Sequence, residues 1–285
     1  MQLLDGKATS AAIRSNLRRE IELLVPRAGR APGLAVVLVG GDPASQVYVR
    51  NKERACEDVG IKSFASRLPE NIGQEDLQNH ITRLNGQEDV DGILLQLPLP
   101  CGLDSLPCIE AISPRKDVDG LHPENQGRLA MDLPGIKPCT PAGVIALLNH
   151  YNLSLEGKRA VVVGRSNLVG RPLAMMLAGR RHNATVTMCH SYTSHLKEEC
   201  RQADYLFLAV GSPRMVGPDM VKEGAVVVDI GINRREDGLC GDADFSALAD
   251  KVSAMTPVPG GVGPMTIAQL LSNTVQAWKR NKGLD

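Results

Sequence analysis

The chain has 285 residues, 43% of them hydrophobic and 3% aromatic, and its 32 basic and 32 acidic residues leave a formal net charge of zero. This length allows two domains with aliphatic cores, and no basic block or aromatic-interleaved basic stripe indicates binding to nucleic acid. No apolar run approaches the roughly 20 residues that span a bilayer, no signal peptide is recognisable, and the seven scattered cysteines include no CxxC pair. We therefore expect a cytoplasmic protein with reduced thiols, no metal site, and no nucleic-acid or membrane partner.

The first half of the chain alternates strand-like and helix-like segments, which predicts a parallel sheet. Apolar periodicity and turn residues predict a helix at 9–25, strands at 34–39, 63–67 and 90–96, helices after Pro43 and at 74–84, and a short helix at 106–111. The stretch 113–141 contains five prolines and is expected to be irregular. Irregular stretches of this length are usually functional or linking.

A second α/β unit is expected after a helix at 142–150. Its predicted elements are a strand at 158–163, a helix that opens in the turn 164–172 and ends near Arg181, strands at 185–189, 205–210 and 225–230, a short strand before Thr256, and a closing helix at 265–279. The chain is therefore predicted to be an α/β protein with two sequential halves and a boundary near residue 140.

Polar side chains of the first half are expected where strands end, which is where ligands bind in open α/β sheets. Ser45, Tyr48 and Lys52 share one helix face, Gln96 closes an apolar strand, and Asp119 lies in a tight turn. A lysine that loses solvent has a lowered pKa and can act as an acid or a base. A glutamine amide can orient that amine, and an aspartate can accept from an amidine-like N–H edge. A solvated lysine, a half-buried tyrosine, a strand-end glutamine and a turn aspartate remain the alternative, more probable for each residue alone than for all four together.

The glycine turn 164–170 lies between an apolar strand and a helix, a geometry in which backbone N–H groups and the helix dipole favour an anion. An ordinary strand–helix turn explains this pattern about equally well. NAD sites usually carry an acidic residue after the second strand, but the segment 189–193 has none. Arg165 could instead meet a 2′-phosphate, with hydrogen bonds from Ser191 and His190, so NADP is favoured over NAD. A solvated loop arginine and a surface histidine are the alternatives.

The loop 257–264 places three glycines between prolines directly before the last helix. Such a sequence lets a ligand approach the backbone closely, so Pro259, Gly260 and Gly261 are predicted to contact the substrate. An irregular connector with Pro264 in the first helical turn is the alternative.

Motifs that belong together are spread over nearly the whole chain. They are Ala44-Ser45 with Tyr48-Val49 and Lys52, GILLQLPLP at 92–100, KDVDG at 116–120, PCTP at 138–141, GRS at 164–166, VGRP at 169–172, DIGIN at 229–233, and the segment 256–265. With these motifs the chain resembles the bifunctional methylenetetrahydrofolate dehydrogenase/cyclohydrolase family. The resemblance implies NADP-dependent oxidation of 5,10-methylenetetrahydrofolate and hydrolysis of the methenyl product to 10-formyltetrahydrofolate.

The resemblance also implies roles for the polar residues of the first half. Lys52 would be the general acid and base of the hydrolytic step, and Gln96 would hold and tune it. Tyr48 would position the folate ring system, and Asp119 would anchor the pterin. Hydride transfer needs no metal, only two ligands held face to face, and one lysine can manage the proton transfers of the hydrolysis that follows.

For the second half, the resemblance implies an NADP site and a place in a larger assembly. Gly164, Arg165, Ser166 and Ser191 would hold NADP, with Ile232 beside the nicotinamide. The implied architecture is a folate-binding catalytic domain of residues 1–140 and 266–285, a Rossmann-type NADP-binding domain of residues 141–265, an interdomain cleft for both ligands, and a homodimer.

The chain departs from the family pattern at a few positions. Tyr192 stands where a basic residue is frequent, and Leu121 and Glu124 replace more usual residues after the Asp-Gly turn. These departures concern cofactor affinity more than reaction type.

Other functions compatible with the second half are a dehydrogenase of another small substrate, of the shikimate or amino-acid type, and an NADP-binding sensor without activity. The polar set of the first half argues for a folate enzyme instead. A folate dehydrogenase that lacks cyclohydrolase activity is a narrower alternative, against which the presence of Lys52 argues.

Overall fold

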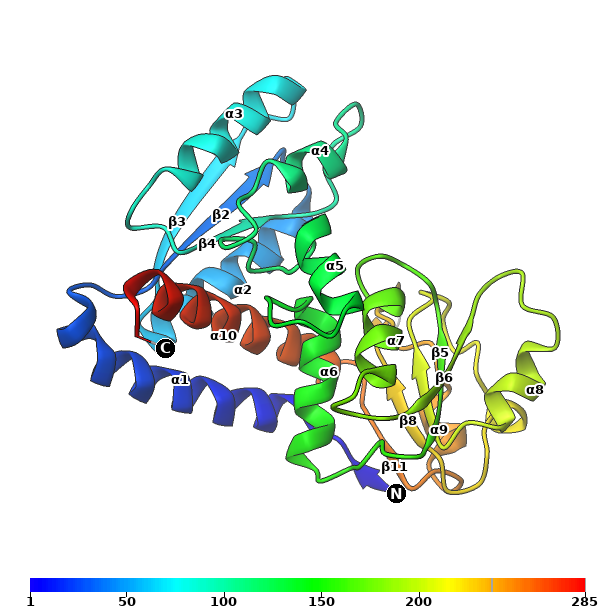
Figure 1. Ribbon diagram of the computed structural model, residues 1–285. Coiled ribbons are helices and arrows are strands. Elements are labelled where there is room, and N and C mark those ends of the chain that lie inside the picture. Colours follow the sequence, from blue (N-terminus) through cyan, green and yellow to red (C-terminus); the bar gives the residue numbers. More distant parts are fainter. Residues whose placement is uncertain (237, 285) are drawn as a thin grey trace. The chain divides into compact units, whose positions relative to one another are not determined.

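The computed structural model describes residues 1–236 and 238–284, and its contacts divide the chain into two compact units (Figure 1). Unit 1 comprises Met1–Ser10, Leu129–Pro134 and Thr140–Thr266, and unit 2 comprises Ala11–Arg128, Gly135–Cys139 and Ile267–Asp285. The expected division placed residues 1–140 in one domain, whereas these contacts group residues 1–10 and 129–134 with the second half of the chain.

Unit 2 is built on a three-stranded parallel sheet with the order β3-β2-β4. The strands are β2 (Gly33–Val39), β3 (Lys62–Leu68) and β4 (Gly92–Leu95). The central strand β2 is buried along its whole length, and because successive side chains point to opposite faces, it contributes to two cores. Leu34, Val36 and Leu38 enter one core, and Ala35, Val37 and Val39 enter the other.

Helices cover both faces of this sheet. The first core includes residues of α1 (Gly6–Ala28), α2 (Pro43–Val59) and the last helix, α10 (Val262–Lys282). The second core includes residues of α3 (Gln74–Asn85) and α4 (Ser105–Glu110). The strands β2 and β4 are therefore buried throughout, as is usual for parallel strands, whereas no residue of the edge strand β3 is fully buried.

Unit 1 contains a six-stranded parallel sheet with the order β1-β11-β8-β7-β5-β6. Its strands are β1 (Gln2–Leu3), β5 (Arg159–Val163), β6 (Thr185–Cys189), β7 (Tyr205–Leu208), β8 (Val226–Asp229) and β11 (Ala254–Met255). The strand order reverses at β5, which pairs with β6 on one side and β7 on the other. Dinucleotides bind at such a reversal in doubly wound sheets.

The remaining elements of unit 1 surround this sheet. They are α6 (Cys139–His150), α7 (Gly170–Ala178), α8 (Leu196–Arg201), the 3₁₀ turn η1 (Pro218–Met220), α9 (Phe245–Leu248), and the antiparallel pair β9 (Asn233–Arg235) and β10 (Gly238–Cys240). Helix α7 packs on β5 and β6. Both halves therefore have parallel sheets covered by helices, which confirms the predicted α/β class.

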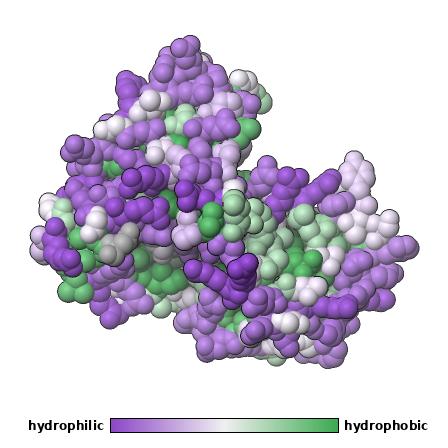
Figure 2. Space-filling model, viewed as in Figure 1, coloured by the Kyte–Doolittle hydropathy of each residue, from purple (hydrophilic) through white to green (hydrophobic). Residues whose placement is uncertain are grey.

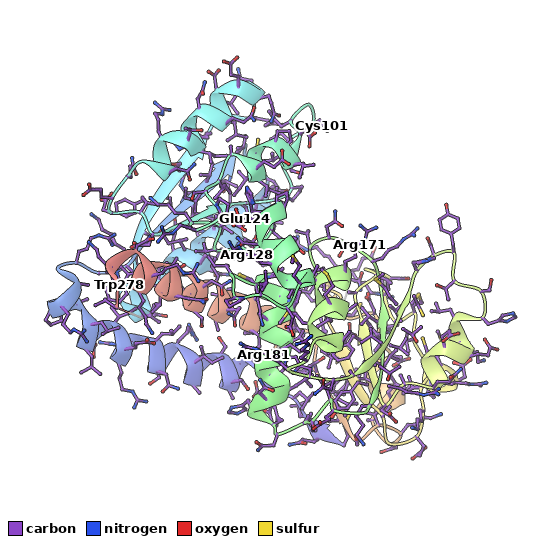
Figure 3. All side chains as sticks on the ribbon, viewed as in Figure 1. Cys101, Glu124, Arg128, Arg171, Arg181 and Trp278 are labelled. Carbon is purple, nitrogen blue, oxygen red and sulfur yellow. The ribbon has the colours of Figure 1, made fainter. Side chains whose placement is uncertain are left out.

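One expected irregular region is partly helical. The stretch predicted to be irregular at 113–141 contains α5 (Pro123–Ala130). Proline is tolerated in the first helical turn, where its missing N–H group would have no partner. The Glu124 N–H donates to His122 Nδ1 at 3.0 Å, and Glu124 pairs with Arg128 at 2.9 Å one turn later (Figure 3). These local contacts support a helix that the density of prolines concealed.

The surface and the helices give two further results. Figure 2 shows that polar and charged residues cover most of the visible face, with apolar residues gathered in limited areas. Among the described residues, no helix combines the length and the apolar character needed to cross a membrane, and no cluster of three or more His, Cys, Asp or Glu side chains is placed to hold a metal ion.

Candidate functional site

Helix α2 is fixed at both ends, and it carries two of the predicted residues one turn apart. The Asp42 carboxylate accepts from the Ser45 N–H at 2.7 Å and caps the helix, and Gly60 ends it with a left-handed conformation at φ 85°. Ser45 faces the core, Tyr48 is 44% exposed, and Lys52 is partly buried. The caps therefore fix where the phenol and the amine project.

Lys52 is held by the residue that follows β4. Its Nζ donates to Gln96 Oε1 at 2.9 Å, while Gln96 Nε2 donates to the Leu97 carbonyl at 2.7 Å. The second bond fixes the amide so that its oxygen faces the lysine. The Gln96 N–H donates to the Val37 carbonyl at 2.9 Å, which anchors its backbone beside the carboxyl end of β2. The predicted contact between these two residues is therefore present in the structure.

Asp119 lies in a turn that a neighbouring carboxylate organises. The Asp117 backbone forms a single parallel β-bridge with Ile93 of β4. The Asp117 carboxylate accepts from the N–H groups of Gly120, Leu121 and His122 and from Asn125 Nδ2 at 2.8–3.2 Å. Gly120 has φ 73°, and a Cβ there would lie 2.5 Å from the Lys137 carbonyl carbon, so only glycine fits.

Burial and charge act together on this group of side chains. Burial lowers the pKa of Lys52, and the nearby Asp119 carboxylate opposes that shift. Burial raises the pKa of Asp119, while the Lys52 ammonium lowers it. Burial and the Asp119 charge raise the pKa of Cys139 well above its usual value, so this thiol stays protonated and donates to the Val118 carbonyl at 3.2 Å. The structure thus brings together Lys52, Gln96 and Asp119, with Tyr48 one helical turn from the lysine.

Residues that the sequence interpretation did not assign also belong to this cluster. No role was predicted for Cys139, although it stands in the PCTP motif at 138–141. Asn273 of α10 is buried and donates to the carbonyls of Val118 at 2.8 Å and Lys137 at 2.9 Å, on both sides of the Asp119 turn. That motif could have identified Cys139, whereas no local signal marks Asn273, because its partners are more than 130 positions away.

In unit 1, the predicted glycine turn connects β5 to α7 and packs closely against neighbouring backbone. Gly164 has φ 127°, and a Cβ there would lie 2.4 Å from the Ala209 carbonyl oxygen, while a Cβ on Gly170 would lie 2.1 Å from the Gly164 oxygen. Ser166 Oγ accepts from the N–H groups of Val169 at 3.1 Å and Gly170 at 3.4 Å. The exposed residues 165–168 lie between this buried turn and the helix. Close backbone packing within the turn therefore requires both glycines. The exposed backbone of 165–168 at the start of a helix fits a dinucleotide phosphate.

The segment after β6 lies close to Arg165. The Arg165 guanidinium stands over the Tyr192 ring at 5.7 Å, within the range of a cation–π contact. The His190 ring accepts from the Tyr192 backbone N–H at 3.2 Å through Nδ1, and the His190 backbone N–H donates to Thr193 Oγ1 at 2.8 Å. Ser191 is exposed. A guanidinium that contacts this segment, with no acidic residue in 189–193, fits a 2′-phosphate better than a free ribose hydroxyl.

The remaining predicted positions follow β8 and β11. Ile232 is 47% exposed. Gly260 accepts from the Lys7 N–H at 3.1 Å, and a Cβ on Gly6 would lie 1.7 Å from the Gly261 oxygen. The loop that holds Pro259, Gly260 and Gly261 therefore packs closely against the start of α1, which by itself requires small residues there.

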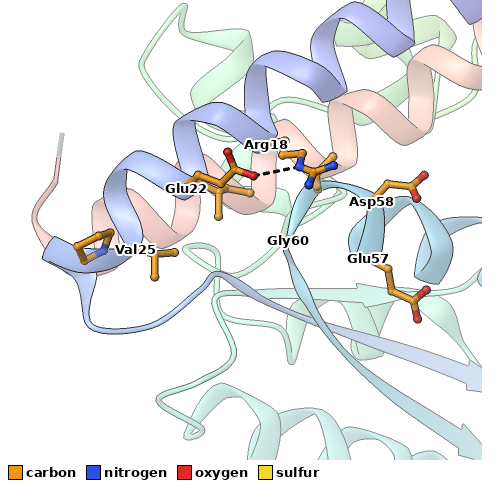
Figure 4. A pocket seen from close by; sticks show the side chains of 9 residues that line it. Arg18, Glu22, Val25, Glu57, Asp58 and Gly60 are labelled. Carbon is orange, nitrogen blue, oxygen red and sulfur yellow. Dashed lines mark hydrogen bonds and ion pairs between the residues drawn. The ribbon is translucent and has the colours of Figure 1, made fainter.

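Unit 2 also has a hollow of about 750 Å³ near the ends of α1 and α2 (Figure 4). Arg18, Glu22 and Val25 line it from α1, and Glu57, Asp58 and Gly60 line it from the end of α2. Lys52, Gln96 and Asp119 are not among its lining residues.

Comparisons with known proteins match both halves of the chain. The model for the tetrahydrofolate dehydrogenase/cyclohydrolase catalytic domain matches residues 4–119, and the model for the NAD(P)-binding domain of the same family matches residues 138–282. The bifunctional protein FolD of Nitratidesulfovibrio vulgaris is 67% identical over 286 residues and is covered completely, as is this chain.

Solved structures agree with the family models. The bifunctional FolD enzyme of Campylobacter jejuni is 51% identical with a TM-score of 0.96, covering 98% of this chain and 99% of that one. The Trypanosoma brucei enzyme, solved with NADP and an inhibitor, is 38% identical with a TM-score of 0.91, covering 97% and 96%. A shikimate dehydrogenase from Aquifex aeolicus shares the fold alone, at 14% identity and a TM-score of 0.53 over 88% and 93% of the two chains.

The family models cover most of the chain, and the relatives are similar along its whole length. The resemblance inferred from the motifs is therefore confirmed: the chain belongs to the tetrahydrofolate dehydrogenase/cyclohydrolase family.

Proposed function

We propose that this enzyme oxidises 5,10-methylenetetrahydrofolate with NADP⁺ and hydrolyses the methenyl product to 10-formyltetrahydrofolate, with Lys52 carrying the protons of the hydrolysis. The observation that carries the assignment of Lys52 is its hydrogen bond to Gln96 at 2.9 Å, in a partly buried place beside Asp119. FolD relatives that are named bifunctional support both activities.

The state of Lys52 suits a residue that both takes up and releases a proton. Since burial lowers its pKa, the neutral amine is more accessible than in a solvated lysine. Loss of hydride leaves a cationic, electrophilic amidinium on the substrate. Lys52 can take a proton from the water that attacks this carbon and return it to the departing ring nitrogen. Gln96 Oε1 keeps the amine oriented through both transfers.

Asp119 and Tyr48 are proposed to hold the folate. The Asp119 carboxylate can accept from the amidine-like N–H edge of the pterin. Burial raises its pKa, and the Lys52 ammonium opposes that shift. The Tyr48 phenol, half exposed on α2, can stack on the ring system. In unit 1, Pro259, Gly260 and Gly261 are proposed to contact the substrate through their backbone.

The NADP site is proposed to use the glycine turn and the segment after β6. Gly164 and Ser166 shape the phosphate cradle, and Arg165 with Ser191 and His190 meets the 2′-phosphate. Ile232 is proposed to lie against the nicotinamide ring. When bound, NADP⁺ accepts the hydride. These residues bind and orient it, and no proton has to be moved at this end of the reaction.

The proposed division of labour follows the domains expected from the sequence. Residues 1–140 with 266–285 would bind folate, and residues 141–265 would bind NADP. Two family models, one named catalytic and ending at residue 119 and one named NAD(P)-binding and beginning at residue 138, support the boundary near residue 140. The grouping of residues 267–285 with unit 2 supports the return of the chain's end to the folate domain. We further propose a homodimer located in the cytoplasm; sedimentation equilibrium showing a monomer at micromolar concentration would contradict the dimer.

The central test compares Lys52→Ala and Lys52→Arg with the wild type. NADPH, methenyl and 10-formyl products are measured from 5,10-methylenetetrahydrofolate. The arginine variant keeps a cation but cannot lose a proton, so we expect both variants to lose hydrolysis by about a hundredfold or more while still binding NADP⁺. The exposed lysine variant Lys62→Ala serves as the control.

Other outcomes would lead to different conclusions. A wild type that makes NADPH but stops at the methenyl product would be monofunctional, and the role of Lys52 would be wrong. A wild type that binds NADP⁺ without reducing it would contradict the folate assignment, and another dehydrogenase or a sensor would then replace it.

A further inference from the structure

Two buried carboxylates at one end of the unit 1 sheet have no part in the reaction as proposed. Asp229 is the last residue of β8 and is 2% exposed, and Asp242 follows β10 and is 0% exposed. Burying a carboxylate is costly unless donors surround it. The hydrogen-bond donors around each carboxylate therefore indicate its structural role.

Asp242 joins the loops that follow two neighbouring strands. Its Oδ2 accepts from the N–H groups of Val210 at 2.8 Å and Gly211 at 3.1 Å, which lie just beyond β7. Its Oδ1 accepts from the Ser212 N–H at 2.8 Å and from Asn233 Nδ2 at 2.9 Å. Asn233 comes directly after Ile232, beyond β8. One carboxylate thus sets the backbone of 210–212 and the residue next to Ile232.

Asp229 in turn holds Asp242. Asp229 Oδ1 accepts from the N–H groups of Asp242 at 3.0 Å and Gly231 at 3.1 Å, and its Oδ2 accepts from Ala243 at 2.8 Å. The chain passes so close that a Cβ on Gly231 would lie 2.2 Å from Asp242 Cγ, and one on Gly241 would lie 1.9 Å from Asp229 Oδ2. The two glycines and the two carboxylates therefore pack together as one buried cluster.

The position of this cluster at the end of the sheet indicates which part of the cofactor it faces. A dinucleotide lies across the point where the strand order reverses, here at β5 between β6 and β7. The residues suited to the 2′-phosphate, Arg165 and Ser191, lie on the β5–β6 side. The other half of the dinucleotide then lies beyond β7 and β8, where the loops joined by Asp242 are found.

We propose that Asp242 is a positioning residue for the nicotinamide half of NADP: by fixing 210–212 and Asn233, it sets the surface against which the ring and its ribose lie. The inference rests on the proposed NADP-dependent function. It does not make Asp242 a catalytic residue, because the carboxylate is fully buried and its oxygens are occupied by protein donors.

The test replaces Asp242 with asparagine, which keeps the shape but leaves one acceptor oxygen. Whichever way the amide is turned, its NH₂ group faces either the N–H groups of Val210 and Gly211 or those of Ser212 and Asn233, so one loop must move. Asp244→Asn is the matched control, since Asp244 caps α9 through Ala247 and asparagine caps equally well.

Three readouts separate a positioning role from a general loss of structure. Calorimetry gives the Kd of NADP⁺ and of 2′,5′-ADP, which lacks the nicotinamide half. Steady-state kinetics give dehydrogenase turnover. Hydrolysis of methenyltetrahydrofolate without added NADP⁺ reports the cyclohydrolase, which needs no dinucleotide. For Asp242→Asn we expect dehydrogenase kcat/KM to fall by about tenfold or more and NADP⁺ binding to weaken, while 2′,5′-ADP binding and hydrolysis stay unchanged. Asp244→Asn should match the wild type throughout.

Two results would overturn the proposal. One is an Asp242→Asn enzyme with wild-type NADP⁺ binding and turnover, and the other is an equal loss of 2′,5′-ADP binding and hydrolysis, which would indicate a merely structural role. If the wild type itself bound neither nucleotide, the proposed function would fail first.

A second variant decides the question if Asp242→Asn does not fold. Asn233→Ala removes one of the four donors to Asp242 and leaves the carboxylate in place. It should show the same pattern of losses to a smaller degree, and unchanged turnover would overturn the proposal.

Discussion

At the scale of single residues, two opposing influences act on the pKa of Lys52. Burial disfavours the ammonium form, whereas the Asp119 carboxylate favours it. Gln96 contributes a neutral acceptor at 2.9 Å, which orients the amine without adding a full charge. A carboxylate in the place of Gln96 would hold the lysine protonated. The amide therefore leaves Lys52 free to exchange a proton.

Gln96→Glu tests this balance through the pH profile of hydrolysis. A carboxylate next to Nζ favours the charged form of Lys52, so it raises the pKa of that residue. If the neutral amine is the base, activity falls as the pH drops below that pKa. The acidic limb of the kcat profile should then move to higher pH. If the limb moves by one pH unit, the activity at a fixed pH on that limb should be about tenfold lower than in the wild type.

The control for added charge is Gln87→Glu, in the exposed turn after α3. It should leave the limb where the wild type has it. A limb that stays in place in Gln96→Glu would contradict the role of Lys52 as a base, even if overall activity fell.

The residues of the site differ in how far the sequence could predict them. Lys52, Gln96 and Asp119 could be placed near one another from the sequence, because strand ends meet at one edge of a sheet. Lys52 lies on the helix that follows β2, Gln96 follows β4, and Asp119 lies in a tight turn. Asp117 was not assigned, because its carboxylate only holds backbone N–H groups of its own turn and the Asn125 side chain of α5. Asp242 was not assigned because its partners come from two other loops. The contacts of Asp242 depend on tertiary structure, which no spacing in the sequence records.

At the scale of elements, α10 fixes the turn that carries Asp119. Asn273 on this helix is 2% exposed and donates to the carbonyls of Val118 and Lys137, while Gln269 Nε2 donates to Asn273 Oδ1 at 2.9 Å. One amide thus ties a helix to two segments that flank the site. The backbone there has no strand ladder of its own to hold it.

Asn273→Ala should therefore lower both stability and folate binding. It leaves two buried carbonyls without this donor, at about 1–3 kcal/mol for each one that finds no other partner. Urea denaturation gives the loss in the free energy of unfolding, and the folate KM should rise as the Asp119 turn loosens. Ser272→Ala is the control, because Ser272 donates only within the helix, to Ala268. A stable variant with an unchanged KM would show that α10 does not brace the turn.

Elements with a strong apolar pattern were predictable, and those defined by local polar contacts were not. The expected strand at 185–189 has the same bounds as β6, and the expected helix at 74–84 differs from α3 by one residue. The two-residue strand β1 is too short to carry a periodic pattern, and it exists because it pairs with β11. Helix α5 begins with a proline and carries one exposed ion pair. These elements form through partners that periodicity does not reveal.

At the scale of the whole molecule, two compact units each have a sheet and a core of their own. The family comparison divides the chain at a similar place, with one model ending at residue 119 and the next beginning at 138. The segment between the two matches contains α5 and ends just before α6 begins. The class and the two-unit organisation were predictable because alternating strands and helices dictate parallel sheets. The contacts that group residues 1–10 with unit 1 include the pairing of β1 with β11 and the hydrogen bond from the Lys7 N–H to Gly260.

The single tryptophan makes it possible to ask which unit binds folate. Trp278 is 0% exposed and belongs to the unit 2 core, with Leu94 of β4 and with Val118 next to Asp119 (Figure 3). Unfolding followed by its emission therefore reports unit 2. Tetrahydrofolate, which has no one-carbon unit to react, should stabilise this transition by about 2.7 kcal/mol at a hundred times its Kd. An Asp119→Ala variant should show a smaller shift at the same concentration, because the pterin would lose its proposed anchor. If tetrahydrofolate left the midpoint of the wild type unmoved, folate would not bind through Tyr48, Lys52 and Asp119.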